Sequence, residues 1–210
     1  MSRLRYNWDE ARRHLRDACP ELRLFIDDFG SARLRVRGGD DLFRALAASI
    51  AYQQLSGKAA ATIHGRFESL FEGGRPVPEQ TLALGFDRLR GCGLSRNKAL
   101  AILDLADKAQ AGELPSPRRL GRLDDEEIVE RLCTVRGIGP WTVHMHLIFC
   151  LGRPDVMPAT DLGVQKGVEA VYGLETTPAP AEVLERTAHL APYRSAASWY
   201  FWRAAEAGAN

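Results

Sequence analysis

The feature that most constrains the fold is a Gly-Ile-Gly turn at residues 137–139, which lies between two apolar helical patterns. Before the turn, apolar side chains recur at helical spacing up to Val135. After it the pattern resumes at Pro140, a residue type that suits the first turn of a helix. Similar patterns, separated by Gly and Pro, fill the rest of the chain. The sequence therefore predicts an all-α fold with about nine or ten helices.

Helical periodicity extends over most of the sequence, with Ser95 as an N-cap and Asp124 with Glu127 as a capping box. Helices are expected over residues 8–17, 41 to the break at 56–57, 58–71, 79–89, 96–111, 124–136 and 140–151, then after Pro158, and over 181–190 and 193–205. Residues 22–29 form a second short apolar piece. Residues 33–37 alternate as Arg-Leu-Arg-Val-Arg, which fits a lone strand or an extended connector. We prefer the connector, because no partner strand is evident.

Composition narrows the class of protein. A chain of 210 residues with 45% hydrophobic content can bury a core, as one domain of two lobes or as two very small domains. No apolar run reaches the roughly 18 residues of a membrane helix, and the charged start does not resemble a signal peptide. We therefore expect a cytoplasmic protein without a membrane partner. A net charge of +1 means that any nucleic-acid binding must rely on a local patch.

The four cysteines are widely scattered and form no CxxC pair or zinc-finger spacing. They are Cys19, Cys92, Cys133 and Cys150. We expect reduced, buried thiols and no iron-sulfur cluster, since a tight cysteine cluster is missing.

The 137–139 turn and Asp161 each allow two interpretations. Glycines at a helix start expose backbone amides that can hold a phosphate, but the same residues suit an ordinary tight turn between helices. Asp161 follows Pro158-Ala159-Thr160 and is a natural helix N-cap, as well as a candidate catalytic carboxylate. These residues alone do not decide between the readings.

Four motifs together resemble a known family. The first joins Gly137-Ile-Gly-Pro-Trp-Thr to Pro158-Ala-Thr-Asp-Leu-Gly-Val-Gln-Lys. The others are Tyr52-Gln-Gln-Leu-Ser with Lys58-Ala-Ala, Gly93-Leu-Ser-Arg-Asn-Lys-Ala, and Pro192-Tyr-Arg-Ser-Ala. Over about residues 40 to 205 the chain resembles the helix-hairpin-helix (HhH-GPD) DNA glycosylases, in the branch of 3-methyladenine DNA glycosylase II, which acts on alkylpurines.

The resemblance implies one glycosylase domain of two helical lobes with a cleft between them. One lobe would span about residues 42–155 with the hairpin at 135–142, and the other about 1–41 plus 156–210. The long bacterial relatives carry an additional N-terminal β domain, and no stretch of strands precedes residue 40 here.

Carried over by position, Asp161 becomes the catalytic residue. The DNA-binding hairpin comprises Gly137, Ile138, Gly139 and Thr142. The backbone carbonyls of Cys133, Val135 and Gly137 become the ligands of a possible monovalent or divalent cation, and no other cofactor is expected.

The resemblance also assigns residues to the flipped nucleotide. The Gln53-Gln54-Leu55 turn would supply the wedge that fills the gap in the duplex. Its tip would be Gln54 or Leu55, and the motif does not choose between them. The base pocket would include Trp141, Met145 and Trp202, whereas Tyr193, Trp199 and Tyr200 are expected to pack the lobe. Base preference stays open, because Thr160 replaces the second acid of many relatives and Met145 stands where an aromatic residue can occur.

Trp141 bears on the reaction. Family members that also cut the strand have a lysine at this position, which attacks the sugar as an amine. A tryptophan has no such amine, so the resemblance implies a monofunctional enzyme. It would excise alkylated bases such as 3-methyladenine from double-stranded DNA. We expect it to be a monomer that is associated with the nucleoid. The alternatives are a glycosylase for another lesion or mismatch and a non-catalytic DNA-damage-binding module.

Overall fold

In a computed structural model, the described residues are 3–37 and 41–208, and they form twelve α-helices, two 3-10 helices and no strand. The all-α prediction is confirmed for this part of the chain, and residues 33–37 are a connector. The expected number of helices was too low, partly because Pro117–Leu120 adds a single helical turn, α7.

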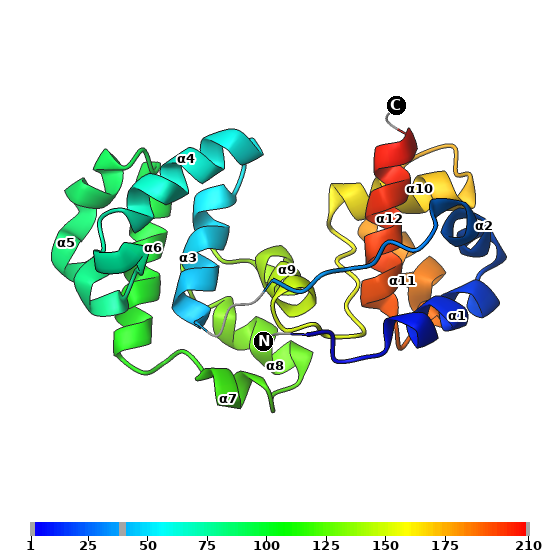
Figure 1. The fold of residues 1–210 in the computed structure, drawn as a ribbon, viewed down its shortest axis with the longest axis horizontal. Helices are drawn as coiled ribbons and strands as arrows, with labels where there is room; N and C mark the ends of the chain where they lie inside the picture. The colour runs from blue at the N-terminus through cyan, green and yellow to red at the C-terminus, as the bar shows by residue number, and fades with distance from the viewer. Residues whose placement is uncertain (1–2, 38–40, 209–210) are drawn as a thin grey trace. The chain divides into compact units, whose positions relative to one another are not determined.

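The described residues group into two compact units (Figure 1). Unit 1 lies within Met1–Gly38 and Leu147–Asn210, and unit 2 lies within Gly39–His146. The second boundary therefore falls inside a helix, at 146/147, and not at 155/156 as the sequence suggested. That helix is α9, Pro140–Phe149, whose first turns belong to unit 2 and whose end from Leu147 belongs to unit 1.

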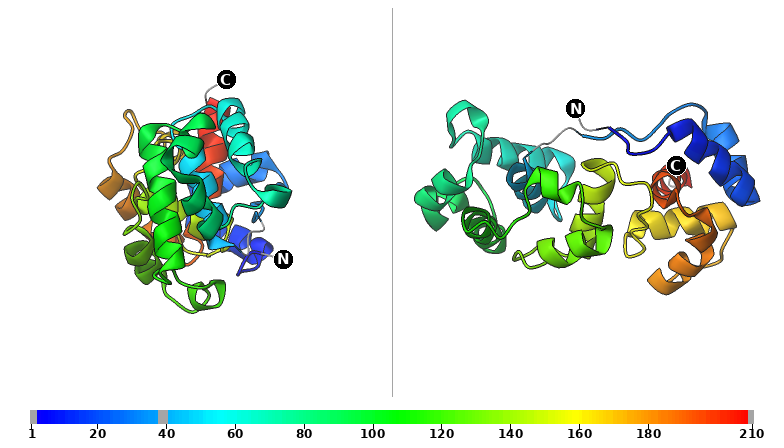
Figure 2. Two further views of the ribbon diagram at one scale, coloured as in Figure 1. Left: turned by 90° about the vertical axis from the view of Figure 1, so that its left-hand side faces the viewer. Right: turned by 90° about the horizontal axis from the view of Figure 1, so that it is seen from below.

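Unit 2 is built around α6, which packs on α3 and on α5 (Figure 2). Its helices are α3 (Leu42–Tyr52), α4 (Gly57–Glu68), η1 (Glu72–Gly74), α5 (Pro78–Gly91), α6 (Arg96–Gln110), α7 and α8 (Asp125–Leu132), followed by the start of α9. The Ser95 N-cap and the Asp124–Glu127 capping box are both present. Inside α5, Gly85 has a positive φ of 70° and interrupts the regular helical backbone.

Unit 1 is built around α10 (Leu162–Tyr172) and α12 (Arg194–Gly208), which pack closely together. Its other elements are α1 (Trp8–Ala18), α2 (Pro20–Phe29), α11 (Pro180–Thr187) and η2 (Ala188–Leu190). Gly167 explains the close approach of α10 to α12, because a Cβ at this position would overlap the backbone of Phe201. The main chain of α12 therefore contacts α10 directly at Gly167.

An aromatic cluster lies between α1 and α12 in unit 1. It contains Tyr193, Trp199 and Tyr200, which were predicted to pack this lobe. The ring of Trp8 lies 5.4 Å from that of Trp199 and 5.7 Å from that of Tyr200, which is fully buried. Tyr193 joins the cluster through Tyr6, at 5.8 Å between ring centroids.

Two expectations about local structure were wrong. The helix expected to reach residue 136 ends at Leu132, because the amide of Val135 bonds the carbonyl of Leu132 and the chain then turns at Gly137. Only two of the four cysteines are buried, Cys19 and Cys92, whereas Cys133 and Cys150 are partly exposed.

Every helix in the described ranges is too short or too polar to cross a membrane.

Candidate functional site

Asp161 is the N-cap of α10 in unit 1. Its Oδ1 accepts a hydrogen bond from the backbone amide of Val164 at 2.8 Å and another from the indole Nε1 of Trp202 at 2.7 Å. The carboxylate is partly exposed. The capping interpretation of Asp161 is therefore confirmed, and the cap leaves the side chain in contact with an aromatic residue of α12.

Gly163 makes room for this contact. A Cβ at position 163 would lie 2.9 Å from Cδ1 of Trp202 and 3.1 Å from Oδ1 of Asp161. Either distance forces a side chain to move. The glycine after Asp161-Leu162 is thus a requirement of the hydrogen bond between Trp202 and Asp161.

The other side of the indole is held by an aromatic stack. The ring of Phe149 lies on Trp202 with 5.4 Å between centroids and an interplanar angle of 26°. The guanidinium of Arg37 lies 5.5 Å from the Phe149 ring centre, and the Arg37 amide donates to the Phe149 carbonyl at 2.7 Å. Trp202 is therefore packed on one face and hydrogen-bonded at its edge, which fixes its orientation.

The segment leading to Asp161 is fastened to the start of α12. Arg194 donates from Nε and NH2 to the two carboxylate oxygens of Asp155, each at 2.7 Å. Burial alone would raise the pKa of Asp155, but the hydrogen bonds and charge of Arg194 outweigh it and lower that pKa. The hydroxyl of Ser195 accepts from the Val156 amide at 3.0 Å. This accounts for the Pro192-Tyr-Arg-Ser-Ala motif, which anchors the loop that carries Asp161.

The hairpin lies in unit 2, between α8 and α9. Gly137 has a φ of 74°, and the amide of Ile138 donates to the Val135 carbonyl at 3.1 Å. Ile138 is also buried, so it supports the turn from within. Helix α9 begins at Pro140 as predicted, and the Gly139 carbonyl accepts from the Val143 amide at 3.2 Å.

Helix α6 packs against the hairpin through Asp104 and Ala101. The Arg136 amide donates to a carboxylate oxygen of Asp104 at 2.8 Å. A Cβ on Gly137 would lie 3.3 Å from the Cβ of Ala101, which is tighter than an ordinary contact. The hairpin backbone therefore has little freedom to shift.

Two of the three carbonyls expected to bind a cation already accept hydrogen bonds. The carbonyl of Val135 accepts from Ile138, and that of Gly137 accepts from the side-chain nitrogen Nε2 of Gln53 at 3.0 Å. A carbonyl oxygen has two lone pairs, so a cation and a donor can share it.

The remaining predicted residues of unit 2 divide by exposure. Gln54 and Leu55 are exposed after the end of α3, and Leu55 is 40% accessible. Trp141 is 41% accessible, and Met145 follows it at the i+4 spacing that places both on one face of α9. Thr142 is 4% accessible, so its side chain lies in the interior.

In unit 1, Thr160 is exposed beside Asp161, and Trp202 is the predicted pocket residue that contacts the carboxylate. Sequence reasoning missed the roles of Gly163, Asp155 and Arg194, and it placed Gln53 in the wedge turn without its bond to the hairpin. The signal for Gly163 and Arg194 was their presence in the quoted motifs, whereas nothing in the sequence links Gln53 to Gly137.

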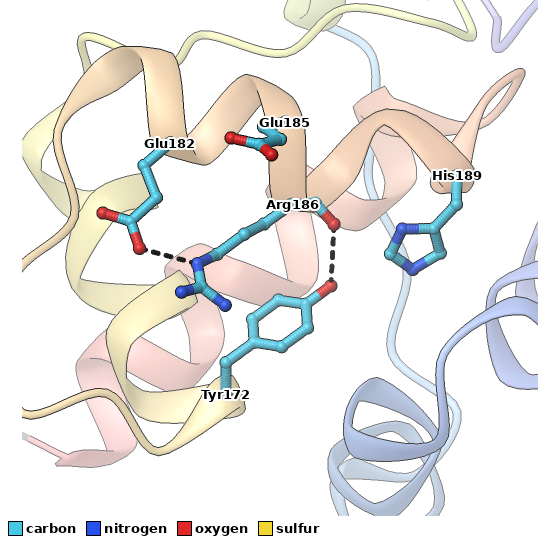
Figure 3. Close-up of a pocket in the computed structure, with 5 residues that line it drawn as sticks. All are labelled: Tyr172, Glu182, Glu185, Arg186 and His189. Carbon is cyan, nitrogen blue, oxygen red and sulfur yellow. Dashed lines mark hydrogen bonds and ion pairs between the residues drawn. The ribbon is translucent and has the colours of Figure 1, made fainter.

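Unit 1 also contains a cavity of about 580 Å³, lined by Tyr172, Glu182, Glu185, Arg186 and His189 (Figure 3). Within it, Arg186 pairs with Glu182 at 2.7 Å and the Tyr172 hydroxyl donates to the Arg186 carbonyl at 3.3 Å. Tyr172 is the last residue of α10, whereas Asp161 caps its beginning. This cavity is therefore separate from the candidate catalytic carboxylate.

Comparison with known proteins identifies relatives along most of the chain. A family model described as "HhH-GPD superfamily base excision DNA repair protein" matches residues 47–192. DNA-3-methyladenine glycosylase 1 of Schizosaccharomyces pombe is 40% identical over 162 residues, which cover 77% of this chain and 71% of that protein.

Two solved structures have the same fold. One is the 3-methyladenine DNA glycosylase of Schizosaccharomyces pombe in complex with abasic DNA, with a TM-score of 0.85, 35% identity and coverage of 92% of this chain and 95% of that one. The other is a DNA-3-methyladenine glycosidase from Bacillus halodurans, with a TM-score of 0.82, 32% identity and coverage of 93% and 88%.

Proposed function

The chain belongs to the HhH-GPD superfamily of base excision DNA repair proteins, and on this basis we propose that it is a monofunctional DNA glycosylase for alkylated purines. The sequence match at 40% identity and the two solved structures, at 35% and 32% identity, are all named for 3-methyladenine. The observation that carries the proposal within this chain is the Asp161 carboxylate, fixed by Val164 and Trp202.

The proposed reaction needs few polar groups. An N-alkylated purine carries a positive charge, so it leaves with the electrons of the N-glycosidic bond as a neutral base. The sugar then resembles an oxocarbenium ion, which a nearby carboxylate stabilises. Water adds to C1′, and its proton passes to Asp161 or to solvent, which leaves an abasic site. A fixed carboxylate reorganises little during this step, which favours the transition state.

Trp202 supports this role for Asp161. Its indole N–H makes a charge-assisted hydrogen bond to one carboxylate oxygen, which holds the side chain in one orientation. The aromatic residues Trp141 and Trp202 also suit a cationic base, since such bases stack favourably on aromatic faces. Met145 shares a helix face with Trp141 and would complete that part of the pocket.

Trp141 also favours base release without strand cleavage. The strand-cutting mechanism requires an amine that attacks C1′ and forms a Schiff base. An indole has no such nucleophile, and a tryptophan occupies the position at the start of α9. We therefore expect intact abasic strands as the product.

The hairpin would hold the DNA backbone. The turn at Gly137 and Gly139 precedes the start of α9, where backbone amides and the helix dipole favour a phosphate. A cation on the carbonyls of Cys133, Val135 and Gly137 would add positive charge beside that phosphate.

One assay tests the proposal. Duplexes that each carry a single defined lesion are incubated with the protein and then divided into samples with and without alkali. We expect strand breaks only after alkali and only for N-alkylated purines. Breaks without alkali would contradict the monofunctional assignment, and release of oxidised or mismatched bases instead would move the enzyme to another lesion class.

The rival function is a non-catalytic DNA-damage-binding module, and the capping bond from Val164 to Asp161 favours it. In that case the carboxylate serves only the helix. Lesion-dependent DNA binding without base release on any duplex would establish this alternative.

A further inference from the structure

The Gly93-Leu-Ser-Arg-Asn-Lys-Ala motif has no role so far, and Gln53 has been described only through its bond to the Gly137 carbonyl. The structure joins them. Lys98 of this motif lies near the start of α6, and its Nζ donates to the carbonyl of Ala51 at 2.9 Å and to that of Gln53 at 2.7 Å. These carbonyls lie at the C-terminal end of α3. A cation is favourable there because the helix dipole is negative at this end and the last backbone carbonyls lack partners within the helix.

The side chain of the same Gln53 reaches the hairpin. Its Nε2 donates to the Gly137 carbonyl at 3.0 Å and lies 3.4 Å from the hydroxyl oxygen of Thr142. Gln53 is therefore held at its backbone by α6 and at its side chain by the hairpin. All five residues of these contacts belong to unit 2.

The ammonium of Lys98 is partly desolvated where it contacts the two carbonyls. Burial lowers the pKa of Lys98, which indicates that the ammonium has lost part of its water shell. Its bonds to the two carbonyls replace that water and are charge-assisted.

The turn that follows Gln53 is strained. Gln54 has a φ of +53°, the left-handed region that side chains other than glycine seldom adopt, and among the described residues it alone does so without being glycine. Such a conformation persists when its surroundings hold it. After it, Leu55 stands 40% exposed.

We propose that Gln53 and Lys98 are positioning residues that fasten the Gln54–Leu55 wedge turn to the hairpin. Phosphate binding by the hairpin and entry of the wedge into the duplex then occur as one rigid step. In this arrangement Gln53 is the tether, and the residues that enter the duplex are Gln54 and Leu55. The inference rests on the proposed function only for the identity of the lesion, since the same tether would serve whatever reaction follows nucleotide flipping.

The first test needs no DNA. Gln53→Met keeps the length of the side chain, Lys98→Met shortens it by one atom, and each substitution removes the donors. In each variant we expect amide hydrogen exchange in a peptide covering residues 51–57 to accelerate about tenfold, as for the loss of one hydrogen bond. Two matched controls in unit 2, Gln80→Met on the exposed face of α5 and Lys108→Met at a surface ion pair, should leave that peptide unchanged. Unchanged exchange in the Gln53 and Lys98 variants would overturn the tether.

The second test measures insertion directly. A duplex with a tetrahydrofuran abasic analogue beside 2-aminopurine reports unstacking by fluorescence, and its affinity is compared with that of an undamaged duplex. We expect Gln53→Met to bind undamaged DNA as the wild type does, while its preference for the abasic duplex falls about tenfold and the fluorescence rise is lost.

The outcomes separate this inference from the proposed function. A wild-type protein without a preference for the abasic duplex, or a Gln53→Met protein that keeps this preference, would overturn the coupling. A wild-type protein that shows the preference and its dependence on Gln53, but releases no base, would support the tether and refute the glycosylase assignment.

Discussion

The indole nitrogen of Trp202 donates a 2.7 Å hydrogen bond to the same oxygen of Asp161 that caps α10. The candidate catalytic carboxylate is thus part of a helix start and in contact with a second helix, α12. This dual role means that substitutions at Asp161 must be chosen to separate chemistry from folding.

Asp161→Asn makes that separation. The amide oxygen still accepts from Val164 and Trp202, and asparagine caps helices as well as aspartate does, so the free energy of unfolding should change by less than about 0.5 kcal/mol. The negative charge is lost, and we expect single-turnover release of an N-methylpurine to fall at least about 100-fold with DNA affinity retained. Asp87→Asn on the exposed face of α5 is the control. Normal turnover by Asp161→Asn would refute the catalytic role.

Gly163→Ala tests the contact between Trp202 and Asp161. The new methyl group lies within 3.1 Å of both side chains and must displace one of them. We expect base release to fall at least about tenfold, since positioning errors of this size are costly, together with a change in the near-ultraviolet circular dichroism of the tryptophans.

Gly65→Ala in α4 is the matched control for Gly163→Ala, because nothing lies within 4 Å of a Cβ there. It should stabilise the protein by about 0.5–1 kcal/mol and leave activity unchanged. Equal activity of both variants would show that the contact with Trp202 is dispensable.

Gly137→Leu tests the hairpin. Gly137 and Gly112 have nearly the same positive φ, 74° and 73°, but a Cβ meets Ala101 only at position 137. Leucine at either position should cost about 1 kcal/mol or more in backbone strain. Only Gly137→Leu should weaken binding to damaged and undamaged duplexes alike, by roughly tenfold, with a shallower dependence of affinity on salt. If both variants bind DNA equally, the hairpin is not the phosphate site.

His146 gives the stability a pH dependence. It is 4% accessible, neither ring nitrogen has a hydrogen-bonding partner among the described residues, and burial lowers its pKa to about 4. Above about pH 6.5 both the folded and the unfolded histidine are neutral, so the free energy of unfolding is at its full value. Between pH 6.5 and 4 the unfolded chain takes up the proton first, and the free energy of unfolding should fall by about 3 kcal/mol in total.

Urea unfolding at pH 7.0, 5.5 and 4.5 measures this loss, and His146→Leu should show a correspondingly flatter profile. His189→Leu replaces an exposed histidine and should retain the wild-type profile. Parallel profiles for all three proteins would exclude His146 as the source.

The sequence predicted most elements because their signals are local. The N-cap at Ser95, the capping box at Asp124 and the start of α9 at Pro140 depend on residues within one turn, and all are present. The end of α8 was mispredicted because Val135 continues the apolar spacing although its amide already belongs to a turn.

The contacts of the site were less predictable. Asp161 and Trp202 are 41 positions apart, and Gln53 and Gly137 are 84 apart. Periodicity cannot reveal such pairs, since it reports only which face of an element is buried. The family resemblance indicated that Asp161 and Trp202 matter, but not that they share a hydrogen bond.

The glycine at position 167 limits how this enzyme can be altered. Because the main chain of Phe201 occupies the place of a side chain there, the spacing of α10 and α12 is set by backbone atoms. Trp202 follows Phe201 directly, so the distance from indole to carboxylate depends on that spacing. Residues on the exposed faces of both helices can therefore be substituted, whereas any residue other than glycine at position 167 would overlap the backbone of Phe201.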